Sequence, residues 1–184
     1  MLAKGSLELL RFQFTGPMHA EARAFVERVR ARYLPVDLSL VVEYGSRDIN
    51  GSVRDIFSAK KYIGIDLIPG KGVDVIGDAG TWRSPTPPDV IVCCELLEHT
   101  ASAERIARNM CASVAPGGFI IITCACDPRA PHSAQDGGTL REGEHYENIK
   151  YSDLSQWIDP GFDVCEFEEH GGRGDLYVIA RKRT

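Results

Sequence analysis

The sequence predicts a three-layer α/β sandwich around a mostly parallel, seven-stranded sheet with one antiparallel strand near the C-terminus. Short apolar runs of β type alternate with helical segments, which is the pattern of a parallel sheet covered by helices on both faces. The last two runs flank the glycine-rich stretch 170–174, and a hairpin there adds an antiparallel strand. The 184 residues fit a single domain, 1–184, since a chain of this length can bury a sizeable core without disulfides.

The first expected element is a helix within an N-terminal helical segment, residues 1–35. From Pro17 to Tyr33, apolar residues recur at helical spacing, with arginine and glutamate between them. Pro35 cannot continue a helix, so we place the end of the segment there.

Five strands are expected from the β-branched and apolar runs at 38–43, 62–66, 73–77, 89–94 and 119–124. Three further helices are expected at 52–57, 99–114 and 152–157. Pro116 and the two glycines after it end the helix that precedes the fifth strand. The terminal hairpin completes the pattern with strands at 162–167 and 176–180.

Residues 127–149 are expected to form a lid loop on the substrate side. They contain proline, glycine, serine and aspartate without periodicity. Long loops in compact domains are usually functional or disordered. Because this loop follows the fifth strand, it leaves the sheet at the carboxyl edge, and few apolar residues hold it down. We therefore expect a mobile lid.

Composition restricts the partners. The net charge is −5 and the pI is about 5.5, which argues against a large nucleic-acid footprint. No stretch approaches the roughly 20 apolar residues of a membrane helix, and the N-terminus lacks a signal-peptide pattern. We expect a cytoplasmic protein without a membrane partner, and a homodimer is left open.

The cysteines are expected to be buried free thiols that act as small hydrophobes. Most lie in apolar strand-like runs and one lies in a helical run. No CxxC pair occurs, which disfavours a four-cysteine zinc site. The six are Cys93, Cys94, Cys111, Cys124, Cys126 and Cys165.

A constellation of residues follows the predicted strands at their carboxyl ends, where ligands of such sheets bind. Gly45 follows the first strand and lets the backbone approach a ligand closely. Asp66 ends the second strand and can accept both hydroxyl protons of a ribose. Asp78 follows the third strand and can accept from an adenine amine, with the Ala79 amide beside it.

From about Leu38 to Cys124 the chain resembles the class I S-adenosylmethionine-dependent methyltransferases, which have a Rossmann-like fold; the resemblance continues more weakly to the end. It implies S-adenosylmethionine as the cofactor. It further implies that the methionine end of the cofactor is lined by Glu43, Tyr44, Gly45 and Ser46, and that the ribose is held by Asp66 and Leu67. By the same resemblance, Asp78 and Ala79 flank the adenine, and Glu95 and Leu96 pass beside the sulfonium.

The first loop departs from that family. Arg47 and Ile49 stand where the family usually carries glycines, so we expect a loop of different length or path. A nicotinamide-binding domain is the competing interpretation, because it also needs a glycine turn and an acid after the second strand. The G-x-G-x-x-G fingerprint of nicotinamide-binding domains does not occur from Gly45 onward. The full set of residues at the carboxyl ends of the strands favours methyl transfer instead.

Glu95, Glu98 and His99 form a second pattern where the fourth strand meets the next helix. Carboxylates with an imidazole suit Mg²⁺ or Zn²⁺. The spacing resembles the metal-binding motif of the ubiquinone O-methyltransferases and the small-RNA 3′-end methyltransferases, which need a further histidine, here His132 or His145. The alternative is that Glu98 and His99 serve the helix start, where the helix dipole favours a glutamate. A divalent metal is considered but not expected.

His132, His145 and Tyr146 are the candidate catalytic residues, because any of them could act as a general base or orient an acceptor hydroxyl. The alternative for each is a solvated loop residue. Trp82 is expected either near the adenine edge or in the core.

These patterns predict methyl transfer from S-adenosylmethionine to an oxygen, nitrogen or carbon of a small molecule. Two alternatives remain. One is methylation of nucleic acid or protein, although Cys93-Cys94-Glu95 differs from the Asp-Pro-Pro-Tyr motif of enzymes that methylate DNA amino groups. The other is a non-catalytic cofactor-binding module, which the altered first loop motivates.

Overall fold

The computed structural model describes residues 20–158 and 160–184. In this part of the chain, three α-helices, two short 3-10 turns and seven strands follow one another. Their order is α1 (Ala20–Tyr33), β1 (Leu38–Tyr44), η1 (Arg54–Ile56), β2 (Ala59–Asp66), β3 (Val75–Ile76), β4 (Val90–Cys94), η2 (Leu97–His99), α2 (Ala103–Ser113), β5 (Phe119–Ala125), α3 (Tyr151–Trp157), β6 (Phe162–His170) and β7 (Asp175–Lys182).

The strands form one sheet in the order β3-β2-β1-β4-β5-β7-β6. Strand β1 pairs in parallel with β2 and β4, and β4 pairs in parallel with β5. Strand β7 is antiparallel to both of its neighbours. The predicted sheet, mostly parallel with one antiparallel strand near the C-terminus, is confirmed. Its strand order reverses between β1 and β4, so the crevice at their carboxyl ends is the expected ligand site.

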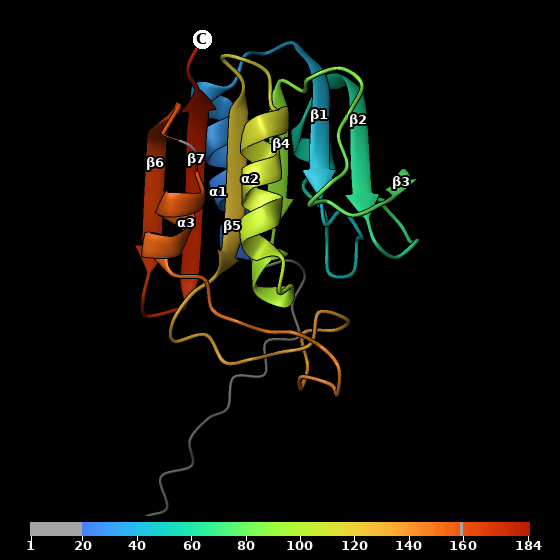
Figure 1. Cartoon of the computed structure of the whole chain (residues 1–184), viewed down its shortest axis with the longest axis vertical. Helices are drawn as coiled ribbons and strands as arrows, with labels where there is room; N and C mark the ends of the chain where they lie inside the picture. The colour runs from blue at the N-terminus through green and yellow to red at the C-terminus, as the bar shows by residue number, and fades with distance from the viewer. Residues whose placement is uncertain (1–19, 159) are drawn as a thin grey trace, which may run out of the picture.

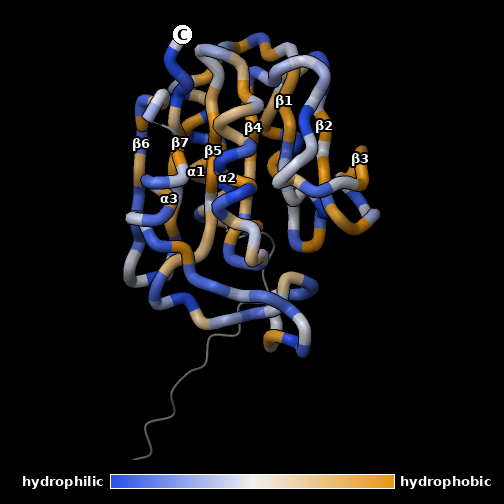
Figure 2. The backbone as a smooth tube through the Cα atoms, viewed as in Figure 1, coloured by the Kyte–Doolittle hydropathy of each residue, from blue (hydrophilic) through white to orange (hydrophobic). Residues whose placement is uncertain are grey.

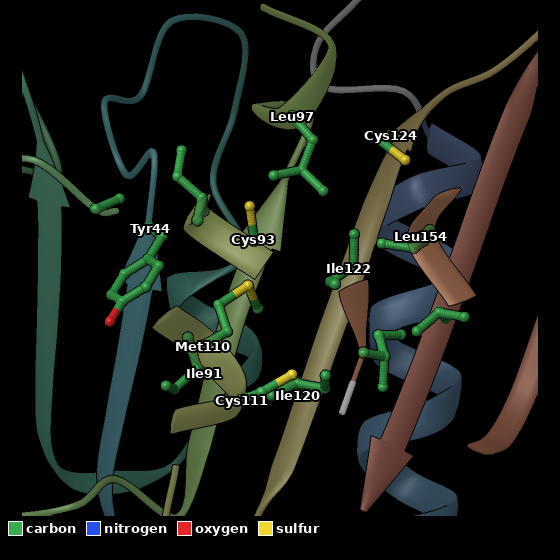
Figure 3. Close-up of a cluster of buried hydrophobic side chains, with 14 of the residues drawn as sticks. Tyr44, Ile91, Cys93, Leu97, Met110, Cys111, Ile120, Ile122, Cys124 and Leu154 are labelled. Carbon is green, nitrogen blue, oxygen red and sulfur yellow. The ribbon is translucent and has the colours of Figure 1, made fainter. Parts of the chain in front are cut away.

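Helices cover both faces of the sheet: α2 and α3 lie on one face and α1 lies on the other (Figure 1). Side chains along a strand alternate between these faces. In β4, Ile91 and Cys93 pack in the core under α2 (Figure 3), whereas Val90 and Val92 pack under α1. The central strands are therefore apolar along their length, while the loop 126–150 beyond their carboxyl ends is mostly hydrophilic (Figure 2).

The expected helix 17–33 is seen from Ala20 and ends at Tyr33 as predicted; its first three residues lie outside the described part. Other predicted bounds were wrong. The expected helix 99–114 begins only at Ala103, because Thr100 adopts an extended backbone and breaks helical hydrogen bonding after η2. The expected helix 52–57 is the single turn η1, and the expected strand 73–77 shortens to β3.

In the described structure, loops with no α-helix connect β2 to β3 and β3 to β4. Asn109 of α2 fixes the second of these loops, since its Nδ2 donates to the carbonyl oxygens of Ala79 and Trp82, each at 2.8 Å. The partly buried Trp82 side chain packs against the core under α2.

All six cysteines are free, as predicted, and five of them are buried. Cys165 is the exception, since it is only partly buried on the edge strand β6. Among the described helices, none is long and apolar enough to cross a membrane.

Candidate functional site

The turn after β1 is closed against β2. Gly45 has a φ of 75°, and the amides of Gly45 and Ser46 donate to the carbonyl oxygen of Ile65 at 2.9 and 3.0 Å. A Cβ atom on Gly45 would lie 3.0 Å from the Leu96 side chain. Glycine at this position therefore lets Leu96, which follows β4, pack directly on the turn.

The segment after β2 contacts the first loop, whose residues depart from the family's glycine pattern. The Asp48 amide donates to the Lys71 carbonyl oxygen at 2.8 Å, and the two side chains form an ion pair at 2.5 Å. A Cβ atom on Gly64 of β2 would lie 2.1 Å from the Gly72 carbonyl oxygen, so the segment after β2 can approach that strand this closely only because residue 64 is glycine. Segment 67–74 therefore packs directly against the first loop.

Asp66 ends β2 beside this loop. Its Oδ2 accepts from the Arg47 amide at 3.3 Å and its Oδ1 from the Ile68 amide at 3.0 Å. Each carboxylate oxygen keeps a free lone pair. Leu67 and Ile76 nearby are 70% and 65% exposed. A carboxylate for two hydroxyls, with apolar side chains beside it, fits the ribose and base of the expected cofactor.

Asp78 and Ala79 occupy the turn after β3. The Asp78 carboxylate accepts from the Gly80 amide at 2.8 Å and forms an ion pair with Arg105 at 2.8 Å. Only its remaining lone pairs are available to a ligand. Ala79 is buried, and Asn109 already uses its carbonyl oxygen.

Glu43 and Tyr44 point to opposite faces of β1. The Glu43 side chain is 3% exposed and accepts from the Tyr62 hydroxyl at 2.8 Å. Burial raises the pKa of this carboxyl to about 7. Tyr44 is buried in the core under α2 (Figure 3). Asn109 donates to its hydroxyl at 3.3 Å. Tyr44 can therefore reach a ligand only through its backbone.

Two acids lie where β4 ends. Glu95 has a left-handed backbone with a φ of 51°, a conformation that costs about 1–3 kcal/mol in a residue other than glycine. Glu98 is completely buried, and its Oε1 accepts from the Ala125 amide at 3.1 Å. Burial raises the pKa of Glu95 to about 7. Burial, together with the neighbouring Glu95, raises the pKa of Glu98 well above its ordinary value.

Buried polar atoms without a hydrogen-bond partner concentrate at this edge of the sheet. Seven such atoms occur among the described residues. One, Arg30 Nε, lies on α1. The other six are Ser46 Oγ, Glu95 Oε1, Glu98 Oε2, His99 Nδ1, Thr123 Oγ1 and Tyr177 Oη. Because buried polar groups are normally paired, this concentration indicates a ligand site at the carboxyl ends of β1, β4 and β5.

Three rings gather beside these atoms. The centroids of His99 and His132 lie 4.9 Å apart, and Tyr146 lies 5.4 Å from His99 and 4.8 Å from His132. Burial lowers the pKa of His99 to about 4 and also lowers the pKa of His132, so both imidazoles are neutral at pH 7. Within the described residues His145 makes no such ring contact; its Nε2 lies 3.9 Å from Glu147 Oε2.

The loop 126–150 is tied down at both ends. The Cys126 amide donates to the Gly174 carbonyl oxygen at 2.8 Å. At the other end, the Glu147 amide donates to the Glu98 carbonyl oxygen at 2.8 Å, and the Ile149 amide donates to the Ala125 carbonyl oxygen at 2.9 Å. The loop is therefore anchored more firmly than its lack of an apolar stripe suggested.

Two residues of the possible metal-binding motif, Glu98 and His99, face different parts of the structure. Glu98 faces β5, whereas His99 faces His132 and Tyr146. In residues 20–158 and 160–184, no group of three or more histidine, cysteine or acidic side chains is placed to hold a metal ion. The binding of a divalent ion by Glu95, Glu98 and His99 stays a prediction that elemental analysis would check.

Sequence reasoning did not single out three polar residues of the site. Thr123 and Tyr177 pair across β5 and β7, and Asp175, at the start of β7, forms an ion pair with Arg129. Thr123 was recognisable as a polar residue in an otherwise apolar run. The other two become neighbours of the site only through the pairing of β7 with β5.

Comparisons with known proteins agree with this geometry. A family model described as a methyltransferase domain matches residues 16–162. Among solved structures, the chain is similar to the N-methyltransferase NodS from Bradyrhizobium japonicum WM9 in complex with S-adenosyl-L-homocysteine, with 16% identity over 92% of this chain and 89% of that one and a TM-score of 0.64. It is also similar to the DhpI complex with the same product, with 21% identity over 90% and 86% and a TM-score of 0.63.

A third similar structure is CalS10, an amino pentose methyltransferase from Micromonospora echinaspora, with 17% identity over 90% and 91% of the two chains and a TM-score of 0.62. At these identities the solved structures show a shared fold. No curated protein matches the chain.

Proposed function

We propose a small-molecule methyl acceptor for this chain, which belongs to the methyltransferase domain family and is an S-adenosylmethionine-dependent methyltransferase of the class I Rossmann-like type. The observation that carries the proposal is the group of unpartnered buried atoms at the ends of β4 and β5. These atoms lie under a loop tied to the sheet, which suits an enclosed ligand better than a macromolecular surface. CalS10, which acts on an amino pentose, has the same fold.

The cofactor would lie across the ends of β1, β2 and β3. S-adenosylmethionine supplies an activated methyl group on its sulfonium. We assign Asp66 to the two ribose hydroxyls, Leu67 and Ile76 to the base, and Asp78 to the adenine amine through the lone pairs that Arg105 and Gly80 leave free.

The acceptor would lie under the loop, beside His99, His132 and Tyr146. The work of these side chains is to hold the acceptor atom in line with the methyl group, which is catalysis by orientation. A neutral imidazole can also take the proton that the acceptor loses. The Tyr146 hydroxyl donates to Asn148 Oδ1 at 3.1 Å, which fixes the position of the ring beside the acceptor.

Label transfer tests the proposal. The protein is incubated with S-adenosylmethionine carrying an isotopically labelled methyl group and with a cell extract separated into small molecules, nucleic acids and proteins. We expect label only in the small-molecule fraction. Label in nucleic acid or protein would overturn the choice of acceptor. Failure to bind either S-adenosylmethionine or S-adenosylhomocysteine in calorimetry would indicate a non-catalytic module instead.

A further inference from the structure

We propose that a groove between α2 and the loop after β3 binds the diphosphate group of a small molecule. The groove is a site apart from the cofactor and acceptor regions, so the inference goes beyond the proposed function. Three features carry it: the arginine side chains that line the groove, the way in which each guanidinium group is held, and the size of the groove.

The groove is locally positive on an acidic chain. Arg83 lines it from the loop after β3, and Arg105 and Arg108 line it from α2. Among the described residues that line it, Glu104 is the only acid. Because the whole chain has a net charge of −5, this surface stands out as one that attracts anions.

Arg83 is held in place by a buried side chain. Asn109 is 5% exposed, and its amide nitrogen donates to the carbonyl oxygens of Ala79 and Trp82. Its Oδ1 accepts from Arg83 Nε at 3.1 Å. The two terminal nitrogens of Arg83 have no hydrogen-bond partner in the described part of the chain, so they are available to a ligand.

Arg108 is held in the same way. Its Nε donates to Glu104 Oε1 at 2.8 Å, and its terminal nitrogens also lack a hydrogen-bond partner among the described residues. The two terminal nitrogens of a guanidinium group form a planar fork that binds phosphate through two parallel hydrogen bonds. Arg83 and Arg108 therefore offer two forks for two phosphoryl groups.

Arg105 supplies a fixed positive charge beside these forks. Its Nη1 pairs with Asp78 Oδ2 at 2.8 Å, and its Nη2 donates to Ser102 Oγ at 3.1 Å. A Cβ atom on Gly80 would lie 2.9 Å from Arg105 Cζ, so glycine lets this guanidinium group lie against the loop. On a helix, residues three and four apart are neighbours at about 5–6 Å, which places residues 108 and 109 next to residue 105.

The size of the groove favours a small organic diphosphate over other anions. Its volume is about 640 Å³, which leaves room for an organic group attached to the two phosphoryl groups. Nucleic acid binds through many phosphate contacts along an extended basic surface. Two forks on a chain of net charge −5 do not form such a surface.

Inorganic pyrophosphate tests the inference without knowledge of the organic group. In calorimetry at constant ionic strength, we expect pyrophosphate to bind at least about tenfold more tightly than inorganic phosphate, because its second phosphoryl group engages the second fork. Arg83→Gln and Arg108→Gln should each weaken pyrophosphate binding at least about tenfold. Arg108→Lys should weaken it as well, since lysine keeps the charge and lacks the fork.

The matched control is Arg32→Gln, which should keep the wild-type affinity. Arg32 is 65% exposed and also pairs with a glutamate, Glu166, but it lies on α1 across the sheet. Arg108→Gln removes an exposed pair with Glu104 and should leave the fold intact, because such pairs contribute little to stability. Circular dichroism checks this.

Equal affinity for pyrophosphate and phosphate would overturn the inference, as would an affinity for pyrophosphate that neither glutamine substitution lowers. Full affinity in Arg108→Lys would show attraction by charge alone and would overturn the two forks. Tighter binding of a ten-nucleotide single-stranded RNA would overturn the choice of a small molecule. Saturating S-adenosylhomocysteine should change the affinity for pyrophosphate less than about threefold, and competition between the two would place the diphosphate in the cofactor region and overturn the separate site.

Discussion

The ends of β1 and β2 differ sharply from the ends of β4 and β5. At β1 and β2, the amides of Gly45, Ser46 and Asp48 already have protein partners, and Leu67 is exposed beside Asp66. At β4 and β5, the polar atoms are buried and several lack partners. The backbone amides of the first region are satisfied without a ligand, and only the buried Ser46 hydroxyl there lacks a partner among the described residues. The second needs a polar ligand to satisfy these atoms, which is how a site for a specific acceptor differs from a preformed cofactor cradle.

The largest expected effect concerns Glu43, a buried acid near the end of β1. Its pKa is raised from 4.5 to about 7 in the folded chain. The stability it contributes is therefore full below pH 4.5 and is lost as the pH rises through about 7. Glu43→Gln removes this loss, so relative to the wild type the variant should gain about 3 kcal/mol between pH 4.5 and pH 8. Urea denaturation of both proteins at several pH values measures this gain. Parallel stability curves would show that Glu43 ionises normally.

The next effect tests whether the acceptor region carries the chemistry. His132→Ala should lower turnover about a hundredfold, because a general base or orienting group is lost. His145→Ala should change it less than about threefold, since within the described residues His145 makes no ring contact with His99, His132 or Tyr146. Steady-state kinetics with the acceptor found by label transfer give both values. Affinity for S-adenosylhomocysteine should stay unchanged in each variant; a loss of cofactor binding in His132→Ala would mean that the two regions are not separate.

A smaller effect tests the cofactor region. Asp66→Ala should weaken binding of S-adenosylhomocysteine at least about tenfold, because charge-assisted hydrogen bonds to two hydroxyls are lost. Asp55→Ala is the control, since Asp55 pairs with Arg23 on the outer surface. Calorimetry measures both affinities, and circular dichroism checks the fold. An unchanged affinity in folded Asp66→Ala would refute the assignment of this carboxylate.

The smallest effect concerns the loop 126–150. The amides of Cys126, Glu147 and Ile149 should exchange slowly, because each donates to a backbone carbonyl oxygen. The amides of Glu142 and Gly143 at the exposed tip should exchange fast. Binding of S-adenosylhomocysteine should slow exchange only at the tip. Fast exchange at Glu147 and Ile149 in the free protein would restore the picture of a fully mobile lid.

Much of the fold could be predicted because the buried parallel strands appear as continuous apolar runs, such as 119–124. The acid that ends the second strand could be placed for the same reason. The start of α2 was missed because Thr100 interrupts a stretch whose composition is helical throughout. The firm attachment of the loop 126–150 was missed because its anchors are backbone groups of distant segments, and backbone groups leave no trace in the residue pattern.

The sequence by itself determined the order of strands and helices, the residue types at the carboxyl edge and the acidic balance of the chain, since these follow from local periodicity and composition. Only the tertiary structure decided which of those residues meet. Glu98 reaches an amide 27 residues away, and Arg129 pairs with an acid 46 residues away. His132 joins His99 while His145 does not. Such contacts depend on the path of the loop between β5 and α3 and on the pairing of β7 with β5. Both are settled by packing over long separations, for which a local pattern contains no signal.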